Sequence, residues 1–151
     1  MKLEGIWWNE LGSKMEIEID PADPKTFRGL YHTNVGSAQE KNYPLLGRCD
    51  DRGLTSKMLA FVVAWNADPP AKPNTPNPSV TAWSGQLQIV DGQEVITTTW
   101  LLERFTAPAD DWESTLVGMD YFKRTRPSPA EVEIARKHGR AARALRAIER
   151  K

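Results

Sequence analysis

The fold of this 151-residue chain is indicated first by eight stretches with the composition of β-strands, each followed by a turn or a loop. Met15–Ile19 alternates apolar and charged side chains, as a half-buried strand does, and Asp91-Gly92 is a strong signal for a tight hairpin turn. Eight strands in succession predict an all-β, eight-stranded antiparallel up-and-down barrel, whose interior holds side chains or one small ligand. The expected strands are Gly5–Leu11, Met15–Ile19, Thr26–His32, Tyr43–Asp50, Ser56–Asn66, Val80–Val90, Glu94–Phe105 and Trp112–Phe122.

The last segment has a different character and predicts a helix. Ser128-Pro129-Ala130-Glu131 combines a capping box with proline at the first helical position. Residues 1–127 are therefore expected to form the barrel, and residues 128–151 a C-terminal amphipathic α-helix with a net charge of +4. A solvated basic tail is the simpler interpretation, but the apolar stripe favours an oligomerisation element. The stripe has heptad spacing and consists of Ile134, His138, Ala141, Leu145 and Ile148.

Composition argues against several classes of function. Lysine plus arginine equals aspartate plus glutamate, at 20 each, so no net charge favours nucleic acid. No apolar run approaches the ~20 residues that span a membrane, and Met1–Glu4 is too short and polar for a signal peptide. The single cysteine, Cys49, excludes an internal disulfide and a multi-cysteine zinc site. Because no acid–base pair, activated nucleophile or metal cluster is evident, we expect neither catalytic nor metal-binding residues.

The strand at Trp112–Phe122 carries an unusual residue. Alternation places Leu116, Gly118, Asp120 and Phe122 on one mostly apolar face. Aspartate at a strand end is often simply solvated. If Asp120 is buried, however, its carboxylate needs a partner, because an unpaired buried charge costs much free energy.

Six tryptophans in one small domain are more than core filling requires: Trp7, Trp8, Trp65, Trp83, Trp100 and Trp112. Trp65, Trp83 and Trp100 fall toward strand ends, and Trp112 opens the stretch that forms the last strand. Together these four predict a rigid apolar box at the barrel mouth, which is how small-molecule sites are usually built. The polar residues interleaved with this box are Asn9, Ser13, Tyr31, Thr33, Thr81 and Asp120.

Over Gly5–Pro127 the chain resembles the avidin and streptavidin family. The resemblance rests on eight short stretches in the same order and with compatible spacing, although any one of them is a weak signal. They are Gly5-Ile6-Trp7-Trp8-Asn9-Glu10-Leu11-Gly12-Ser13, Gly29-Leu30-Tyr31, Val35-Gly36-Ser37-Ala38, Leu46-Gly47-Arg48, Val63-Ala64-Trp65, Thr81-Ala82-Trp83-Ser84-Gly85-Gln86, Thr99-Trp100-Leu101-Leu102 and Ser114-Thr115-Leu116-Val117-Gly118-Met119-Asp120.

This resemblance implies that the ligand is biotin, bound without any cofactor in the open end of the barrel. Asn9, Ser13 and Tyr31 would donate hydrogen bonds to the ureido oxygen. Thr33 and Asp120 would accept from the two ureido N–H groups. Charge-assisted hydrogen bonds of this kind are stronger than neutral ones in a dry site.

The same resemblance assigns the remaining contacts. Thr81 would face the ring sulfur, and Ser37 and Ser79 would meet the valerate carboxylate. The walls around the bicyclic ring would be Trp65, Trp83 and Trp100, and Trp112 would reach into a neighbouring subunit's pocket.

Some positions depart from the family pattern. Thr33 replaces a serine and keeps the hydroxyl, whereas Ser37 replaces an asparagine. Met119 replaces an interface histidine, so the family's tetramer is one expectation and another oligomer, such as a hexamer fixed by the C-terminal helix, is the alternative. The family also implies a secreted or periplasmic protein. A carrier for a different small cyclic ligand, or an assembly module with a vestigial pocket, remain alternative functions.

Overall fold

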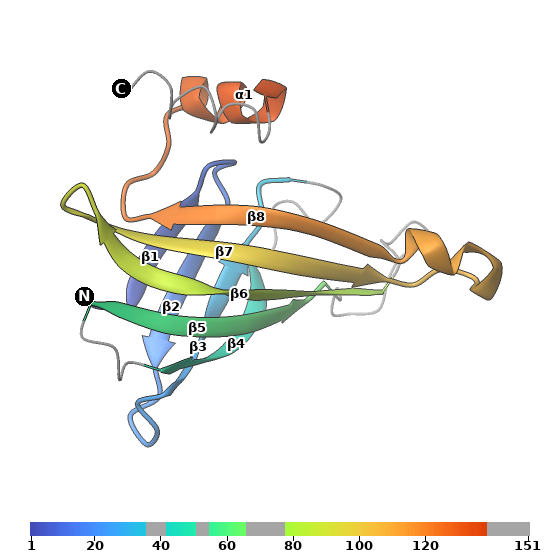
Figure 1. The fold of residues 1–151 in the computed structure, drawn as a ribbon. Helices are drawn as coiled ribbons and strands as arrows, with labels where there is room; N and C mark the ends of the chain where they lie inside the picture. Colours follow the sequence, from blue (N-terminus) through green and yellow to red (C-terminus); the bar gives the residue numbers. More distant parts are fainter. Residues whose placement is uncertain (36–41, 51–54, 66–77, 139–151) are drawn as a thin grey trace.

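The computed structural model, which describes residues 1–35, 42–50, 55–65 and 78–138, is a closed barrel of eight antiparallel strands in chain order (Figure 1). The predicted fold class is therefore confirmed. The strands are β1 (Gly5–Asn9), β2 (Lys14–Ile19), β3 (Thr26–His32), β4 (Asn42–Asp50), β5 (Ser56–Ala64), β6 (Ser79–Val90), β7 (Gln93–Arg104) and β8 (Thr115–Lys123). A short 3-10 helix, η2 (Pro108–Glu113), precedes β8, and helix α1 (Pro129–His138) follows it.

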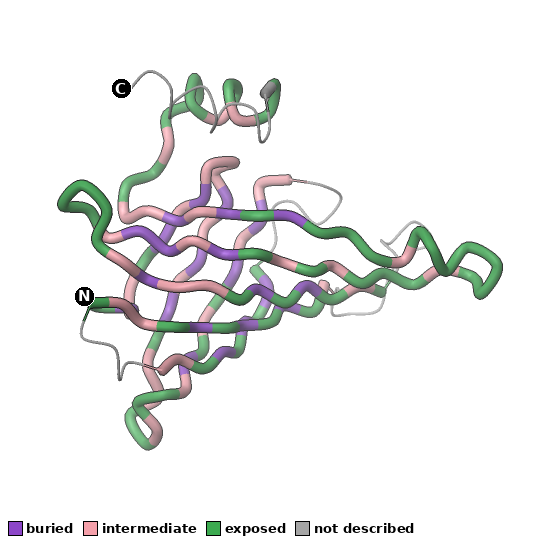
Figure 2. Tube along the Cα trace, in the orientation of Figure 1, coloured by how far each residue is buried: buried purple, intermediate pink, exposed green. Residues whose placement is uncertain are grey.

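Alternating side chains fill the barrel. Along β4, Tyr43, Leu45 and Gly47 are buried while the residues between them are exposed, and β5 shows the same alternation from Leu59 to Val63 (Figure 2). In β8, Gly118, Asp120 and Phe122 face inward as the sequence predicts. Leu116 does not: it is 47% exposed, because the first part of β8 extends beside β7 toward η2 (Figure 1).

Turn chemistry fixes where strands end. Asp91 and Gly92 have φ angles of 49° and 75°, the pair of positive values that a tight hairpin turn requires, and they join β6 to β7. The predicted turn is thus confirmed. The last strand was expected to begin at Trp112 but begins at Thr115, and Trp112 lies just before it in η2, which has proline in its first turn.

The end of the barrel away from the β1–β2 turn is closed by the N-terminal segment. Leu3 is 3% exposed, and its carbonyl accepts a hydrogen bond from the Trp7 Nε1–H at 2.7 Å. The Arg124 guanidinium stacks on the Trp7 ring at 3.6 Å from the ring centre. Arg124 also donates to the carbonyls of Lys2, Glu4 and Ile6 and pairs with Glu94 at 3.0 Å.

Helix α1 begins as its capping box predicts. The Ser128 hydroxyl accepts from the backbone N–H of Glu131, whose carboxylate accepts from the Ser128 N–H at 2.8 Å. Val132 is half-buried, whereas Ile134 of the predicted seam is 43% exposed. Residues 139–151 lie outside the described residues, so assembly through this seam stays a prediction. Within the described ranges, no helix has the length and apolar character needed to cross a bilayer.

We predict that Arg124→Ala lowers the free energy of unfolding by about 2 kcal/mol, because it removes a cation–π stack and hydrogen bonds to three backbone carbonyls. Urea denaturation measures the change. Arg28→Ala is the matched control: Arg28 is 60% exposed and pairs with Asp20, so its loss should cost less than about 0.5 kcal/mol. Equal effects of the two substitutions would contradict this account of the barrel end.

Candidate functional site

The β1–β2 turn holds Asn9 by its amide oxygen. Asn9 is buried, and its Oδ1 accepts from the backbone N–H groups of Leu11 at 3.1 Å and Ser13 at 2.8 Å. Gly12 permits the tight return of the chain, with a φ of +81°. Because the turn occupies the oxygen, the side-chain NH2 is the end of Asn9 that remains to donate to a ligand.

Ser13, Tyr31 and Thr33 are also buried, each by 96% or more. The Ser13 Oγ accepts from the Asn34 N–H at 3.0 Å and also makes a side-chain hydrogen bond with Tyr31. Thr33 forms a local turn in which its hydroxyl donates to the Val35 carbonyl at 3.1 Å. These hydroxyls therefore sit at fixed positions near the end of β3.

Asp120 is buried, with 8% of its surface exposed, and its Oδ2 accepts from the Trp83 Nε1–H at 2.9 Å. The Asp120 carbonyl accepts from the Thr98 hydroxyl at 3.2 Å. The simpler interpretation of a solvated aspartate is thus wrong. The Trp83 indole N–H, from β6, supplies one of the hydrogen bonds that the buried carboxylate requires.

Burial raises the pKa of Tyr31 well above its usual 10.0, and the negative charge of Asp120 raises it further. The hydrogen bond from Ser13 acts in the opposite direction but is the weaker influence. Two conclusions follow. Tyr31 is a neutral hydrogen-bond donor at any physiological pH, and it lies close enough to feel the Asp120 charge.

Aromatic rings surround these polar groups. Trp83 lies between two stacked neighbours, Phe61 at 4.8 Å with parallel planes (9°) and Tyr31 at 5.2 Å (29°). Trp65 meets Tyr31 edge-on at 5.7 Å and Tyr43 at 5.1 Å, and its Nε1–H donates to the Thr81 hydroxyl at 2.7 Å. The rings therefore hold each other in place before any ligand arrives.

Trp100 completes this group from β7, where it is paired in register with Trp83 on one side and Gly118 on the other. A Cβ on Gly118 would lie 2.0 Å from the Trp100 Cζ2 atom, which is far inside contact distance. Glycine at position 118 therefore lets the Trp100 ring lie flat against β8.

Two predicted site residues differ from this buried group in their exposure. Trp112 is 79% exposed in η2. Ser79 is half-buried at the start of β6, where its carbonyl accepts from the Trp65 N–H at 2.9 Å. Ser37 lies outside the described residues.

Sequence reasoning missed four residues that support the site: Phe61, Tyr43, Thr98 and Asn34. The alternation of the expected strand Ser56–Asn66 places Phe61 on one face with Leu59 and Val63, but it cannot show which ring it will contact. The contacts of Thr98 and Asn34 depend on register and loop path, which no local pattern reveals.

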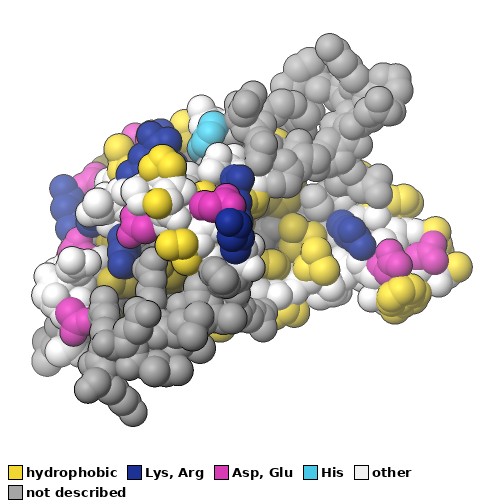
Figure 3. Space-filling model, turned by 90° about the horizontal axis from the view of Figure 1, so that it is seen from above, with side chains coloured by type: hydrophobic (Ala, Val, Ile, Leu, Met, Phe, Trp, Pro, Cys, Tyr) yellow, Lys and Arg dark blue, Asp and Glu magenta, His cyan; other side chains and the backbone are white. Residues whose placement is uncertain are grey.

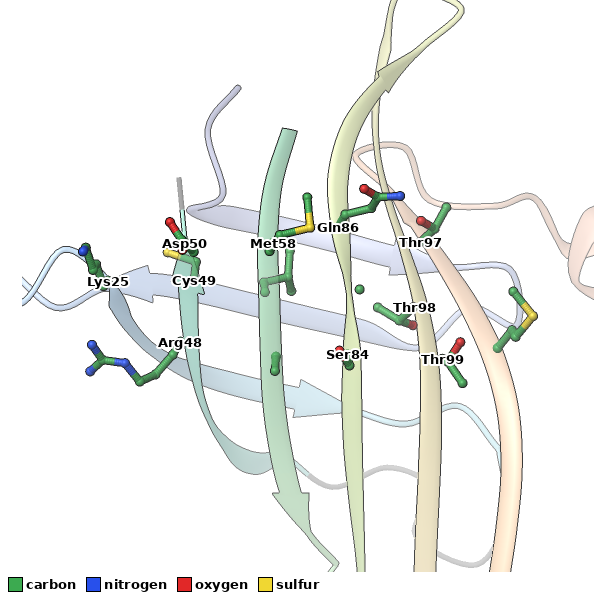
Figure 4. Close-up of a pocket in the computed structure, with 14 residues that line it drawn as sticks. Lys25, Arg48, Cys49, Asp50, Met58, Ser84, Gln86, Thr97, Thr98 and Thr99 are labelled. Atoms are coloured by element: carbon green, nitrogen blue, oxygen red, sulfur yellow. The ribbon is translucent and has the colours of Figure 1, made fainter. Parts of the chain in front are cut away.

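A hollow of about 980 Å³ lies on the outside of the wall formed by β4–β8 (Figure 4). Outward-facing side chains such as Met58, Ser84 and Thr99 line it, and Asn9, Ser13, Tyr31 and Asp120 are not among its lining residues. On the face seen in Figure 3, basic and acidic side chains lie next to one another and form no large field of one sign. Among the described residues, no His, Cys, Asp and Glu side chains form a group that could hold a metal ion.

The arrangement fits a small ligand that presents both a carbonyl oxygen and N–H groups. Amide and hydroxyl donors from β1–β3 and a carboxylate acceptor from β8 occupy one volume with aromatic walls. Hydrogen bonds made away from water in this way are strong and directional.

A family model described as "Avidin family" matches residues 1–125. Avidin from Gallus gallus is 33% identical over 129 residues, which cover 82% of this chain and 78% of that protein. Fibropellin-1 from Strongylocentrotus purpuratus is 29% identical over 133 residues, which cover 85% of this chain but only 11% of that longer protein.

We predict that Tyr31 does not ionise while the protein is folded. Since folding raises its pKa, the neutral phenol contributes stability that is complete below pH 10.0 and is lost as the pH rises through the folded value. The ultraviolet absorbance of tyrosinate, compared between wild type and Tyr31→Phe, should differ only where the chain unfolds at alkaline pH. A difference near pH 10 in the folded protein would contradict the burial and charge described here.

Proposed function

Since the chain belongs to the avidin family, we propose that it binds biotin without covalent attachment in the open end of the barrel. The observation that carries this proposal is the buried carboxylate of Asp120, held by Trp83 in the same volume as the hydroxyls of Ser13 and Tyr31. The proposed role is that of a binding protein and not of an enzyme.

In this proposal the ureido group of biotin is recognised by complementary hydrogen bonds. The ureido oxygen accepts from Asn9, Ser13 and Tyr31. This role suits Asn9, whose amide oxygen is already occupied, and Tyr31, whose phenol stays protonated. Asp120 and Thr33 accept from the two N–H groups. Because the carboxylate is charged and nine-tenths buried, its bond to the ligand is the strongest of the set.

The apolar part of the ligand lies against the aromatic rings. Trp65 and Trp100 line the bicyclic ring with their faces or edges, while Trp83, stacked on both sides, forms a fixed floor. The Thr81 hydroxyl accepts from Trp65, so its own hydrogen is directed toward the ring sulfur. Ser37 and Ser79 meet the valerate carboxylate in this proposal.

Self-association completes the site. Trp112 is exposed here and covers a neighbour's pocket in the proposed assembly. The outer wall of the barrel offers an apolar surface for this contact, made by Leu46, Val62, Leu101, Val117 and Met119, which are 46–58% exposed. A tetramer is the family's arrangement, and a different oligomer such as a hexamer follows if α1 directs assembly. Secretion or a periplasmic location also stays a prediction.

We predict that biotin changes the intrinsic tryptophan fluorescence and that the titration breaks near one biotin per chain. The physical reason is that the proposed ligand lies directly against Trp65 and Trp100. The measurement uses the full chain at known concentration, with a biotin analogue that lacks the ureido group as competitor. Failure of biotin to alter the signal, together with a response to other cyclic ligands, would favour the alternative carrier.

We predict that Asp120→Ala weakens biotin binding by at least about 2 kcal/mol, because a charged, desolvated hydrogen bond is lost. Trp83→Phe is the matched variant, since it removes the indole N–H that holds Asp120 and keeps an aromatic ring. Its effect should be smaller. Calorimetric titration measures binding, and urea denaturation separates a loss of stability from a loss of affinity. A change of tenfold or less for Asp120→Ala would contradict the assigned role.

A further inference from the structure

Helix α1 begins at Pro129, beyond the residues 1–125 that the family model matches, yet it contacts the turn that carries the site donors. In Figure 1 it lies above the end of the barrel where β1 and β2 meet. We propose that α1 braces the β1–β2 turn and Asn34, and that this brace slows release of the ligand. The effect on the ligand rests on the proposed function, whereas the effect on the turn does not.

Three contacts hold the helix and its preceding segment in place. The Arg126 guanidinium lies over the Trp8 ring at 4.9 Å. The Val132 Cγ2 atom lies 3.5 Å from where a Cβ on Gly12 would be, so the valine packs against the backbone of the turn. The Arg136 Nη2 donates to the Asn34 carbonyl at 3.2 Å.

Asn34 connects the helix to the site. Its backbone N–H donates to the Ser13 Oγ at 3.0 Å and its side-chain NH2 donates to the Leu11 carbonyl at 2.9 Å. Leu11 in turn donates to the Asn9 Oδ1. Asn34 therefore accepts the hydrogen bond from α1. It also helps to fix both proposed ureido donors, Ser13 directly and Asn9 through Leu11.

The physical consequence concerns preorganisation. A donor group already held in its binding geometry loses less conformational entropy when the ligand arrives, and such gains appear mainly in the dissociation rate. The Asn34 backbone N–H occupies one lone pair of the Ser13 hydroxyl oxygen. The hydroxyl hydrogen of Ser13 is not used in this bond and points away from Asn34. Arg136 and Val132 are thus positioning residues that act through Asn34 and Gly12.

The brace is a partial one. A cleft of about 600 Å³ remains beside the contacts and is lined by residues of both the helix and the turn, among them Gly12, Asn34, Val132 and Arg136. The helix is held at separate points and not by continuous packing, so its influence corresponds to one or two weak interactions. We expect an effect of about three- to tenfold on exchange and dissociation rates.

The test compares the Val132→Ala/Arg136→Ala double variant with wild type in the full chain. The expected result is biotin dissociation faster by about three- to tenfold, and amide hydrogen exchange at residues 11–13 and 34 faster by a similar factor. Amides of β6 and β7 serve as an internal reference and should not change. Lys137→Ala is the matched control, because Lys137 lies on the same helix and pairs with Glu133 at 3.5 Å.

A second comparison separates positioning from general stability. If α1 acts through Ser13, the double variant should accelerate dissociation much less in a Ser13→Ala background. Unchanged exchange in the turn, or equal acceleration in both backgrounds, would overturn the proposal. A wild-type chain that fails to bind biotin would refute the proposed function alone, because the exchange measurement still judges the brace.

Discussion

The barrel depends on the pairing that joins its last strand to its first. Among the described residues, β1 meets β8 through two register pairs, Trp8 with Lys123 and Asn9 with Phe122, whereas β6 and β7 pair along their whole lengths. Without this short ladder the sheet would have two open edges, and an open edge invites pairing with other chains. The same ladder sets Asn9 of the first hairpin two residues from the level of Asp120 on the last strand. Closure of the sheet and assembly of the polar site are therefore one event.

Most of the fold could be predicted from the sequence, because strand alternation and turn chemistry are local signals. The Asp91-Gly92 hairpin and the capping box at Ser128 lie where these signals place them. The exposure of Leu116 and the place of Trp112 in η2 could not be predicted, since both depend on how far β7 and β8 extend beyond the barrel. The inward residues of the site were predictable as a set, but their contacts were not. The stacking of Phe61 on Trp83 requires the register of two strands.

Polar groups in the site have structural partners as well as a proposed ligand. The Asn9 oxygen closes a turn, the Trp83 N–H holds Asp120, and the Trp65 N–H holds Thr81. Buried polar atoms are costly when unpaired, so these protein–protein hydrogen bonds stabilise the fold around the site. It also orients each group, because a side chain with one hydrogen bond already made has few ways left to make another. The rigidity of these side chains is thus a consequence of the hydrogen bonds that satisfy the buried polar atoms.

The two ends of the described chain are attached to different parts of the fold. Lys2 and Leu3 are tied by hydrogen bonds to the closed end of the barrel, so a tether at the N-terminus would load a part of the protein remote from Asn9 and Ser13. A tether on the C-terminal side would pull on α1 before it pulled on β8, and the load would reach Asn34 through Arg136. Force on one end would leave the polar site untouched, whereas force on the other would be transmitted to it.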